Sequence, residues 1–187
     1  DEEVIVVDDL DEGFEIVDGD SGSGMRIKSK KKDNVETDQG LPVMIPGQGV
    51  SEWSRYTTPE AFGKYRHTFA IVKGGSGDKT AVFGVEIPQA GSWDLEVYLP
   101  RDASIMRRAL RDTDSWKFAV EDDSGSQDVT FEAQSGESGW NSLGSFELSG
   151  GETRVTLSDE TEGRMVIADA IRWVRSSGSP AAGAVEE

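Results

Sequence analysis

The chain contains no cysteine and only one histidine, His67, among its 187 residues. Disulfide bonds and thiolate metal sites are therefore excluded, and a zinc site with four protein ligands is effectively ruled out. A nucleophilic triad would also have to pass through His67, and no serine elbow or phosphate-binding glycine loop accompanies it. Because His67 is in phase with Phe69 and Ile71 on an expected strand, we expect it to pack or hydrogen-bond within the fold. We predict no catalytic residue and no enzyme activity.

Long apolar runs and basic side chains are also scarce. No segment approaches the roughly 18 consecutive apolar residues that cross a bilayer, so we predict no membrane insertion. The chain has 36 acidic and 19 basic side chains, for a net charge of −17. That charge repels a phosphate backbone, which makes nucleic acid a poor partner. Acidity of this kind suits a soluble surface, calcium binding or life in high salt.

What the sequence does contain is a recurring alternation of apolar and polar residues. In residues 93–99 the apolar side chains of Trp93, Leu95 and Val97 alternate with polar ones, as in a strand with one wet face. Turn residues at 88–91 separate this strand from a similar one at 81–87. Further strands are expected at 4–7, 14–17, 68–72, 116–120, 129–133, 145–148, 154–158 and 165–174. Their regular spacing predicts an all-β fold, a jelly-roll-like antiparallel β-sandwich.

The length suits one well-filled core, so we predict a single domain over residues 1–175. Within it, residues 18–50 are polar and read as a long loop insertion near the N-terminus. The segment 104–111 is the one expected helix, with Ser104 or Asp102 as its N-cap. Residues 176–187 are rich in Ser, Gly, Ala and Pro and read as a flexible tail or linker.

Several motifs stand in an order that resembles one family, the golvesin C-terminal-like or Xly carbohydrate-binding-like domains of bacterial enzymes and surface proteins. They are the segments 6–9 and 13–14, Trp53, the segment 63–67, the segment 87–100, Trp140 to Gly144, and the segment 166–172. The resemblance implies a β-sandwich accessory module that binds carbohydrate and lies outside the cytoplasm, extracellular or periplasmic. Two stretches depart from the pattern: the insertion at about 19–50 and the arginine-rich segment 101–114.

Aromatic and basic residues outside the alternating strands are the candidate ligand contacts. Trp53, Tyr56 and Tyr65 fall in a polar region and could form a flat face for stacking on sugar rings. The alternative for Trp53 is that it is buried and caps one end of the sandwich. Arg107 and Arg108 belong to an arginine cluster that suits the carboxylate or sulfate groups of an acidic polysaccharide. The alternative for them is pairing with acidic residues of the chain itself.

Acidic residues give one candidate metal site and one buried carboxyl. Asp8, Asp9 and Asp11 are close in sequence and offer the oxygen ligands of a structural calcium site, although no EF-hand loop is present. Asp169 shares a strand face with Ile167 and Ile171, so we expect its carboxyl to be buried with a role in fixing the fold.

Two functions therefore stand side by side. The first is a non-catalytic accessory module of a larger protein that binds polysaccharide through Trp53, Tyr56 and Tyr65. The second is an architectural or protein–protein interaction module that packs against other domains of its parent protein and binds no free ligand. The first requires an exposed aromatic face, whereas the second predicts a broad apolar patch.

Overall fold

The computed structural model describes residues 3–18, 40–44, 50–110 and 115–176. Nearly every regular element in these ranges is a strand. In chain order the elements are β1 (Val4–Asp8), β2 (Phe14–Asp18), β3 (Ser54–Thr57), β4 (Thr68–Lys73), β5 (Lys79–Ile87), β6 (Gly91–Leu99), α1 (Met106–Ala109), β7 (Ser115–Asp122), β8 (Gly125–Glu132), a 3-10 turn (Ala133–Ser135), β9 (Gly139–Leu148), β10 (Gly151–Ser158), β11 (Met165–Ala168) and β12 (Ala170–Arg175).

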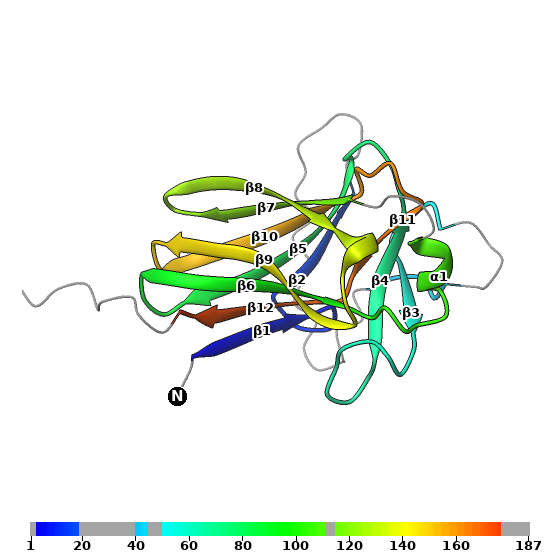
Figure 1. Ribbon diagram of the computed structural model, residues 1–187, viewed down its shortest axis with the longest axis horizontal. Coiled ribbons are helices and arrows are strands. Elements are labelled where there is room, and N and C mark those ends of the chain that lie inside the picture. Colours follow the sequence, from blue (N-terminus) through cyan, green and yellow to red (C-terminus); the bar gives the residue numbers. More distant parts are fainter. Residues whose placement is uncertain (1–2, 19–39, 45–49, 111–114, 177–187) are drawn as a thin grey trace, which may run out of the picture.

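The strands form three antiparallel sheets (Figure 1). Sheet A has the order β1-β12-β6-β9, and sheet B has the order β2-β5-β10-β7-β8. Sheets A and B are the two layers of the sandwich, and the smaller sheet C, β11-β4-β3, lies at one end beside α1 (Figure 1). The predicted all-β sandwich is confirmed.

The core lies between the layers because alternate side chains of each strand point inward. In β6 the inward residues Trp93, Leu95 and Val97 are at most 2% exposed. From sheet B they are met by Phe83 and Val155, at most 1% exposed. Four tryptophans, Trp53, Trp93, Trp116 and Trp173, are at most 1% exposed. Burying one large apolar side chain contributes about 1.5–3 kcal/mol, so these rings supply a large part of the apolar burial that favours folding.

Two elements differ from the sequence prediction. The expected helix 104–111 is reduced to α1, and neither Ser104 nor Asp102 caps it, because its N-cap is Ile105 with no side-chain hydrogen bond. The expected single strand 165–174 is two strands, β11 in sheet C and β12 in sheet A, separated at Asp169. No helix in the described ranges is long and apolar enough to cross a membrane.

Most of the predicted insertion 18–50 and all but the first residue of the predicted tail 176–187 lie outside the described residues. The part of the insertion within them, 40–44, runs beside β3. The amide of Arg55 donates to the carbonyl oxygen of Pro42 at 2.8 Å, and the amide of Met44 donates to the carbonyl oxygen of Arg55 at 2.9 Å. This short segment therefore adds to the edge of sheet C.

Candidate functional site

The structure does not bring the three predicted sugar-stacking residues onto one exposed face. Trp53 is 1% exposed and belongs to the core, as the alternative interpretation required. It comes directly before β3, residues 54–57, which contains Tyr56 and pairs with β4. Tyr56 is half-buried and stacks on Phe69, with ring centroids 5.2 Å apart. Tyr65 alone is fully accessible, at 85% exposure.

A different group of rings gathers on the outer face of sheet A. Phe62, Tyr98 and Trp140 are each partly exposed, and we call them the aromatic cluster. Their centroids are 5.4 Å apart for Phe62–Tyr98, 5.2 Å for Phe62–Trp140 and 5.2 Å for Tyr98–Trp140. Tilted and edge-on contacts of this kind hold aromatic rings in fixed mutual orientation. The cluster is therefore a preorganised apolar surface.

A β-bulge places Trp140 on this outer face. Phe146 and Leu148 point into the core from β9, so strict alternation would also turn Trp140 inward. The pairing of β9 with β6 shifts between Leu95 and Glu96, and one extra residue, Leu143, is accommodated there. Beyond the shift Trp140 pairs with Tyr98, which faces outward. A bulge commonly re-aims side chains in this way.

Local hydrogen bonds fix the turn that precedes Trp140. The Asn141 side-chain oxygen accepts from the amide of Glu137 at 2.8 Å, and its nitrogen donates to the carbonyls of Glu137 and Gly139 at 2.9 and 2.8 Å. The side chain thus joins both ends of the turn between the 3-10 segment and β9. The position of the neighbouring indole is set by these contacts.

Polar groups border the aromatic cluster. The guanidinium carbon of Arg172 lies 4.6 Å from the centroid of the Trp140 ring, a cation–π contact. The same arginine forms an ion pair with Glu96 on the neighbouring strand β6. Burial, with Asp169 and Asp102 nearby, raises the pKa of the Tyr98 hydroxyl, which therefore remains a neutral hydrogen-bond donor. The site combines apolar ring surface with donors and acceptors.

Asp169 holds Phe62 in the cluster. Its two carboxyl oxygens each lie 3.2 Å from the amide nitrogen of Phe62, which donates to them. Asp169 is 0% exposed, which confirms the predicted burial. Burial raises its pKa well above the usual value, opposed by the Phe62 amide and reinforced by the negative charges of Asp9 and Asp8. Asp169 thereby ties the loop between β3 and β4 to the kink between β11 and β12.

The predicted calcium ligands make contacts within the fold instead. Asp9 is 0% exposed, accepts from the Thr68 hydroxyl at 3.0 and 3.1 Å, and lies 3.4 Å from a guanidinium nitrogen of Arg55. The Asp9 amide donates to Asp8, and the Asp8 amide donates to Asp11, both at 2.8 Å. Over the described ranges, no group of three or more acidic or histidine side chains is arranged to hold a metal ion.

The remaining predicted residues are exposed. His67 follows the loop and its Nδ1 lies 2.8 Å from the carbonyl oxygen of Ala61, so it hydrogen-bonds within the fold as expected. Arg107 and Arg108 project from α1 into solvent. Neither forms an ion pair with any residue of the described ranges.

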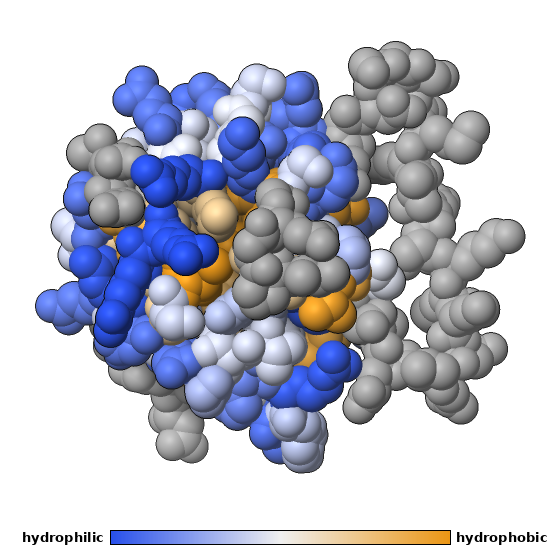
Figure 2. Space-filling model, turned by 90° about the vertical axis from the view of Figure 1, so that its right-hand side faces the viewer, coloured by the Kyte–Doolittle hydropathy of each residue, from blue (hydrophilic) through white to orange (hydrophobic). Residues whose placement is uncertain are grey.

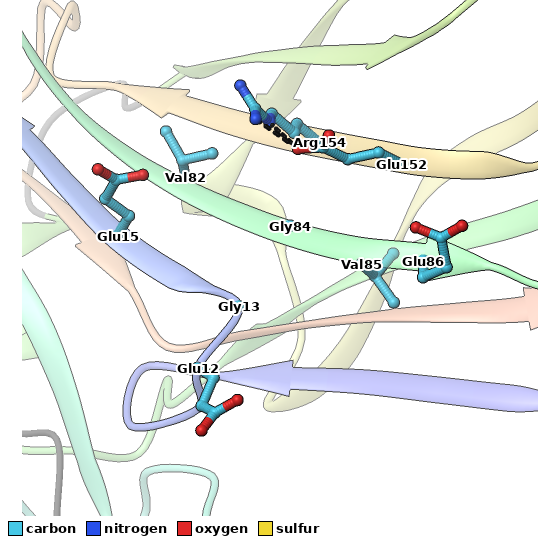
Figure 3. A pocket seen from close by; sticks show the side chains of 9 residues that line it. All are labelled: Glu12, Gly13, Glu15, Val82, Gly84, Val85, Glu86, Glu152 and Arg154. Carbon is cyan, nitrogen blue, oxygen red and sulfur yellow. Dashed lines mark hydrogen bonds and ion pairs between the residues drawn. The ribbon is translucent and has the colours of Figure 1, made fainter. Parts of the chain in front are cut away.

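A shallow groove on the opposite layer has a different chemistry (Figure 3). Its floor is Gly13 and Gly84, whose backbones approach so closely that a Cβ on Gly13 would lie 2.2 Å from the Gly84 oxygen. Arg154 forms an ion pair with Glu152 on the same strand, β10 (Figure 3). The lining is Glu12, Gly13, Glu15, Val82, Gly84, Val85, Glu86, Glu152 and Arg154. No ring lines this groove, so it lacks a stacking surface for sugars.

Comparison with known proteins decides the family. The family model of the Golvesin C-terminal domain matches residues 47–175. The chain belongs to the Golvesin C-terminal domain family. The match contains the aromatic cluster and Asp169, whereas β1 and β2, with Asp8 and Asp9, precede it. No curated protein matches the chain.

Among solved structures, a Paenibacillus xanthan lyase is similar to this golvesin-type domain, with a TM-score of 0.61 and 18% identity over 93% of this chain and 13% of the lyase. This domain thus spans a small part of that protein, and the likeness supports the fold. A family 35 carbohydrate-binding module from Clostridium thermocellum gives a TM-score of 0.46 with 13% identity over 69% of this chain and 91% of the module. A GH26-CBM35 mannanase from Podospora anserina gives a TM-score of 0.45 with 14% identity over 70% of this chain and 27% of the mannanase.

Sequence reasoning missed most of the aromatic cluster. The alternation in β6 already placed Tyr98 on the wet face, so that residue had a signal. Trp140 was part of a family motif, but no local pattern showed that it faces outward, because the bulge reverses its direction relative to the rest of β9. Phe62 comes from a loop more than 30 residues away from Tyr98, and only the fold brings the two together.

Proposed function

We propose that this golvesin-type domain is a non-catalytic accessory module that binds carbohydrate on the outer face of sheet A, outside the cytoplasm. The aromatic cluster is the observation that carries the proposal. Sugar rings present apolar C–H faces that pack on aromatic rings, while their hydroxyls require hydrogen-bonding groups at the edge. Phe62, Tyr98 and Trp140 supply the rings, and Arg172 with Glu96 supplies the polar border.

Three further features support a binding site. The three rings are partly exposed, although large aromatic side chains are usually mostly buried. The hydrogen bonds of Asp169 and Asn141 hold the segments that carry these rings without a ligand. Binding therefore has only a small entropic cost for ordering the site. Tyr65, at 85% exposure, stands three residues after Phe62 and gives the same loop a second accessible ring.

The test is a glycan array of neutral and acidic polysaccharides, screened with the wild type and with Trp140→Ala. We expect the variant to bind the retained glycans about 10- to 30-fold more weakly, the effect of losing a central aromatic contact. Val4→Ala is the matched control, because Val4 is an exposed apolar residue, 47% accessible, on the same sheet but on its edge strand β1. Silence across the array, or equal binding by both variants, would contradict the proposal.

The architectural function is the second candidate, and an apolar area at the sheet C end favours it (Figure 2). Val43 is 75% exposed there, and Leu41 and Met44 are only partly buried. This alternative predicts that the chain associates with other domains of its parent protein and that Val43→Asp weakens the association. Isothermal titration calorimetry between this chain and the separately produced remaining domains would measure the association. Undiminished binding by Val43→Asp would show that this surface does not mediate it.

A further inference from the structure

The two arginines of α1 have no acidic partner among the residues that the structure describes. Other arginines, such as Arg154, Arg172 and Arg175, are engaged by glutamates. Arg107 and Arg108 are exposed and make no ion pair with a described residue, although the chain carries a net charge of −17. Two adjacent guanidinium groups without a described acidic partner therefore form a small positively charged area on a protein whose net charge is negative.

The backbone that carries this pair is fixed. Met106 and Ala109 of α1 are at most 1% exposed and pack into the core, so the intervening Arg107 and Arg108 must face outward. Arg101 in the preceding loop donates to the carbonyl oxygen of Ala133 at 3.2 Å. The guanidinium groups therefore stand on a rigid element.

A short loop links these arginines to the strand that carries Tyr98 of the aromatic cluster. The loop that leaves β6 after Tyr98 leads directly into α1 (Figure 1). Asp102 in this loop is close enough to act on the Tyr98 hydroxyl, and the Ser104 hydroxyl lies 3.4 Å from that of Tyr56. Hydroxyl groups of this kind suit the hydroxyls of a sugar chain. Along the chain, Tyr98 of the cluster, Ser104 with its hydroxyl contact to Tyr56, and the two arginines thus follow one another within residues 98–108.

We propose that the carbohydrate site is selective for anionic polysaccharides, whose carboxylate or sulfate groups bind Arg107 and Arg108 while sugar rings pack on the aromatic cluster. This inference rests on the proposed function and adds the charge of the ligand to it. Guanidinium groups bind carboxylate and sulfate through paired hydrogen bonds. Without these arginines, the negative charge of the protein would favour neutral chains instead.

The experiment compares polymers that differ mainly in charge. Affinity electrophoresis would use two pairs of polymers, each with an anionic and a neutral member. The first pair is de-esterified and fully methyl-esterified homogalacturonan, and the second is carboxymethyl cellulose and hydroxyethyl cellulose. We expect the wild type to prefer the anionic member of at least one pair. Arg107→Ala/Arg108→Ala should reduce binding to that anionic polymer by about 2- to 30-fold, the effect of two exposed charge contacts, and leave the neutral partner unaffected. Added salt should weaken only the anionic interaction.

Lys117→Ala/Arg154→Ala is the matched control, since it removes the same charge from sheet B. A wild type that binds neutral polymers as well as anionic ones, or a control that loses as much affinity as the arginine variant, would overturn the inference and leave the proposed function standing. A wild type that binds none of the polymers, and none on the glycan array, would overturn both.

Discussion

Asp8 shows how a single buried carboxyl links this fold to pH. It is 8% exposed, and burial together with the charge of Asp9 raises its pKa from 3.8 to about 8. The pKa values of Asp9 and Asp169 are also raised, chiefly by burial. Arg55 and Arg66 are the cations whose charges act on Asp9. Asp169 accepts from the amide of Phe62, and Asp9 accepts from the Thr68 hydroxyl just after the loop that carries Phe62, so the protonation of these carboxyls is coupled to the contacts that hold this loop.

The free energy of unfolding should therefore fall as the pH rises from about 4 to about 8. In that interval the Asp8 carboxyl binds its proton more tightly in the folded state than in the unfolded state, so the native state holds more protons. As the pH rises and these protons dissociate, this contribution to the free energy of unfolding is lost. Asp8→Asn, which keeps the shape and stays neutral, should show a shallower fall. Urea unfolding at a series of pH values measures both slopes, and equal slopes would show that Asp8 is not a source of the dependence.

At the scale of elements, the loop between β3 and β4 depends on a glycine that allows its backbone to turn sharply. Gly63 has φ +142°, and a Cβ on it would lie 1.9 Å from the carbonyl oxygen of Arg66. Gly125, the first residue of β8, has nearly the same φ, +141°, with no atom within 4 Å of the added carbon. An alanine at either position has the cost of an unfavourable φ, but only an alanine at Gly63 also has a steric clash with the backbone. Comparing the two variants therefore separates these two costs.

Gly63→Ala should lower the free energy of unfolding more than Gly125→Ala. Both variants have a cost on the order of 1 kcal/mol from the unfavourable φ, and the backbone clash at Gly63 adds roughly 1–3 kcal/mol. Because the loop positions Phe62 and Tyr65, Gly63→Ala should also weaken glycan binding, whereas Gly125→Ala should not. Thermal unfolding and the glycan assay test the two effects separately, and the same loss in both variants would rule out the clash.

For the whole molecule, the N-terminal strands belong to the fold although the family match begins at residue 47. β1 pairs with β12 at the edge of sheet A, and β2 pairs with β5 at the edge of sheet B. Phe14 of β2 is 1% exposed, and Asp9 between the two strands is the buried partner of Arg55. Removing these strands would expose core side chains and leave a buried arginine without its carboxylate.

A chain of residues 47–175 should therefore lack a cooperative unfolding transition, because single losses of a buried ion-pair partner already cost about 3–5 kcal/mol and typical domains have only about 5–15 kcal/mol of stability. A chain of residues 1–175 is the control and should unfold like the full-length protein. Circular dichroism melting and the dispersion of amide NMR signals distinguish the two. Native-like dispersion in the shorter chain would show that β1 and β2 are dispensable.

The sequence by itself determined the class of fold and most of its strands, since alternation of apolar and polar residues is a local property that each strand carries independently. It also indicated that Asp169 is buried. Tertiary structure decided the site. Trp53, directly before β3, is a core residue, and Trp140 reached the surface through a bulge that reverses the alternation. Phe62 joined the cluster through a hydrogen bond to Asp169, 107 residues away. Contacts between such distant residues leave no local pattern, so only the folded chain reveals them.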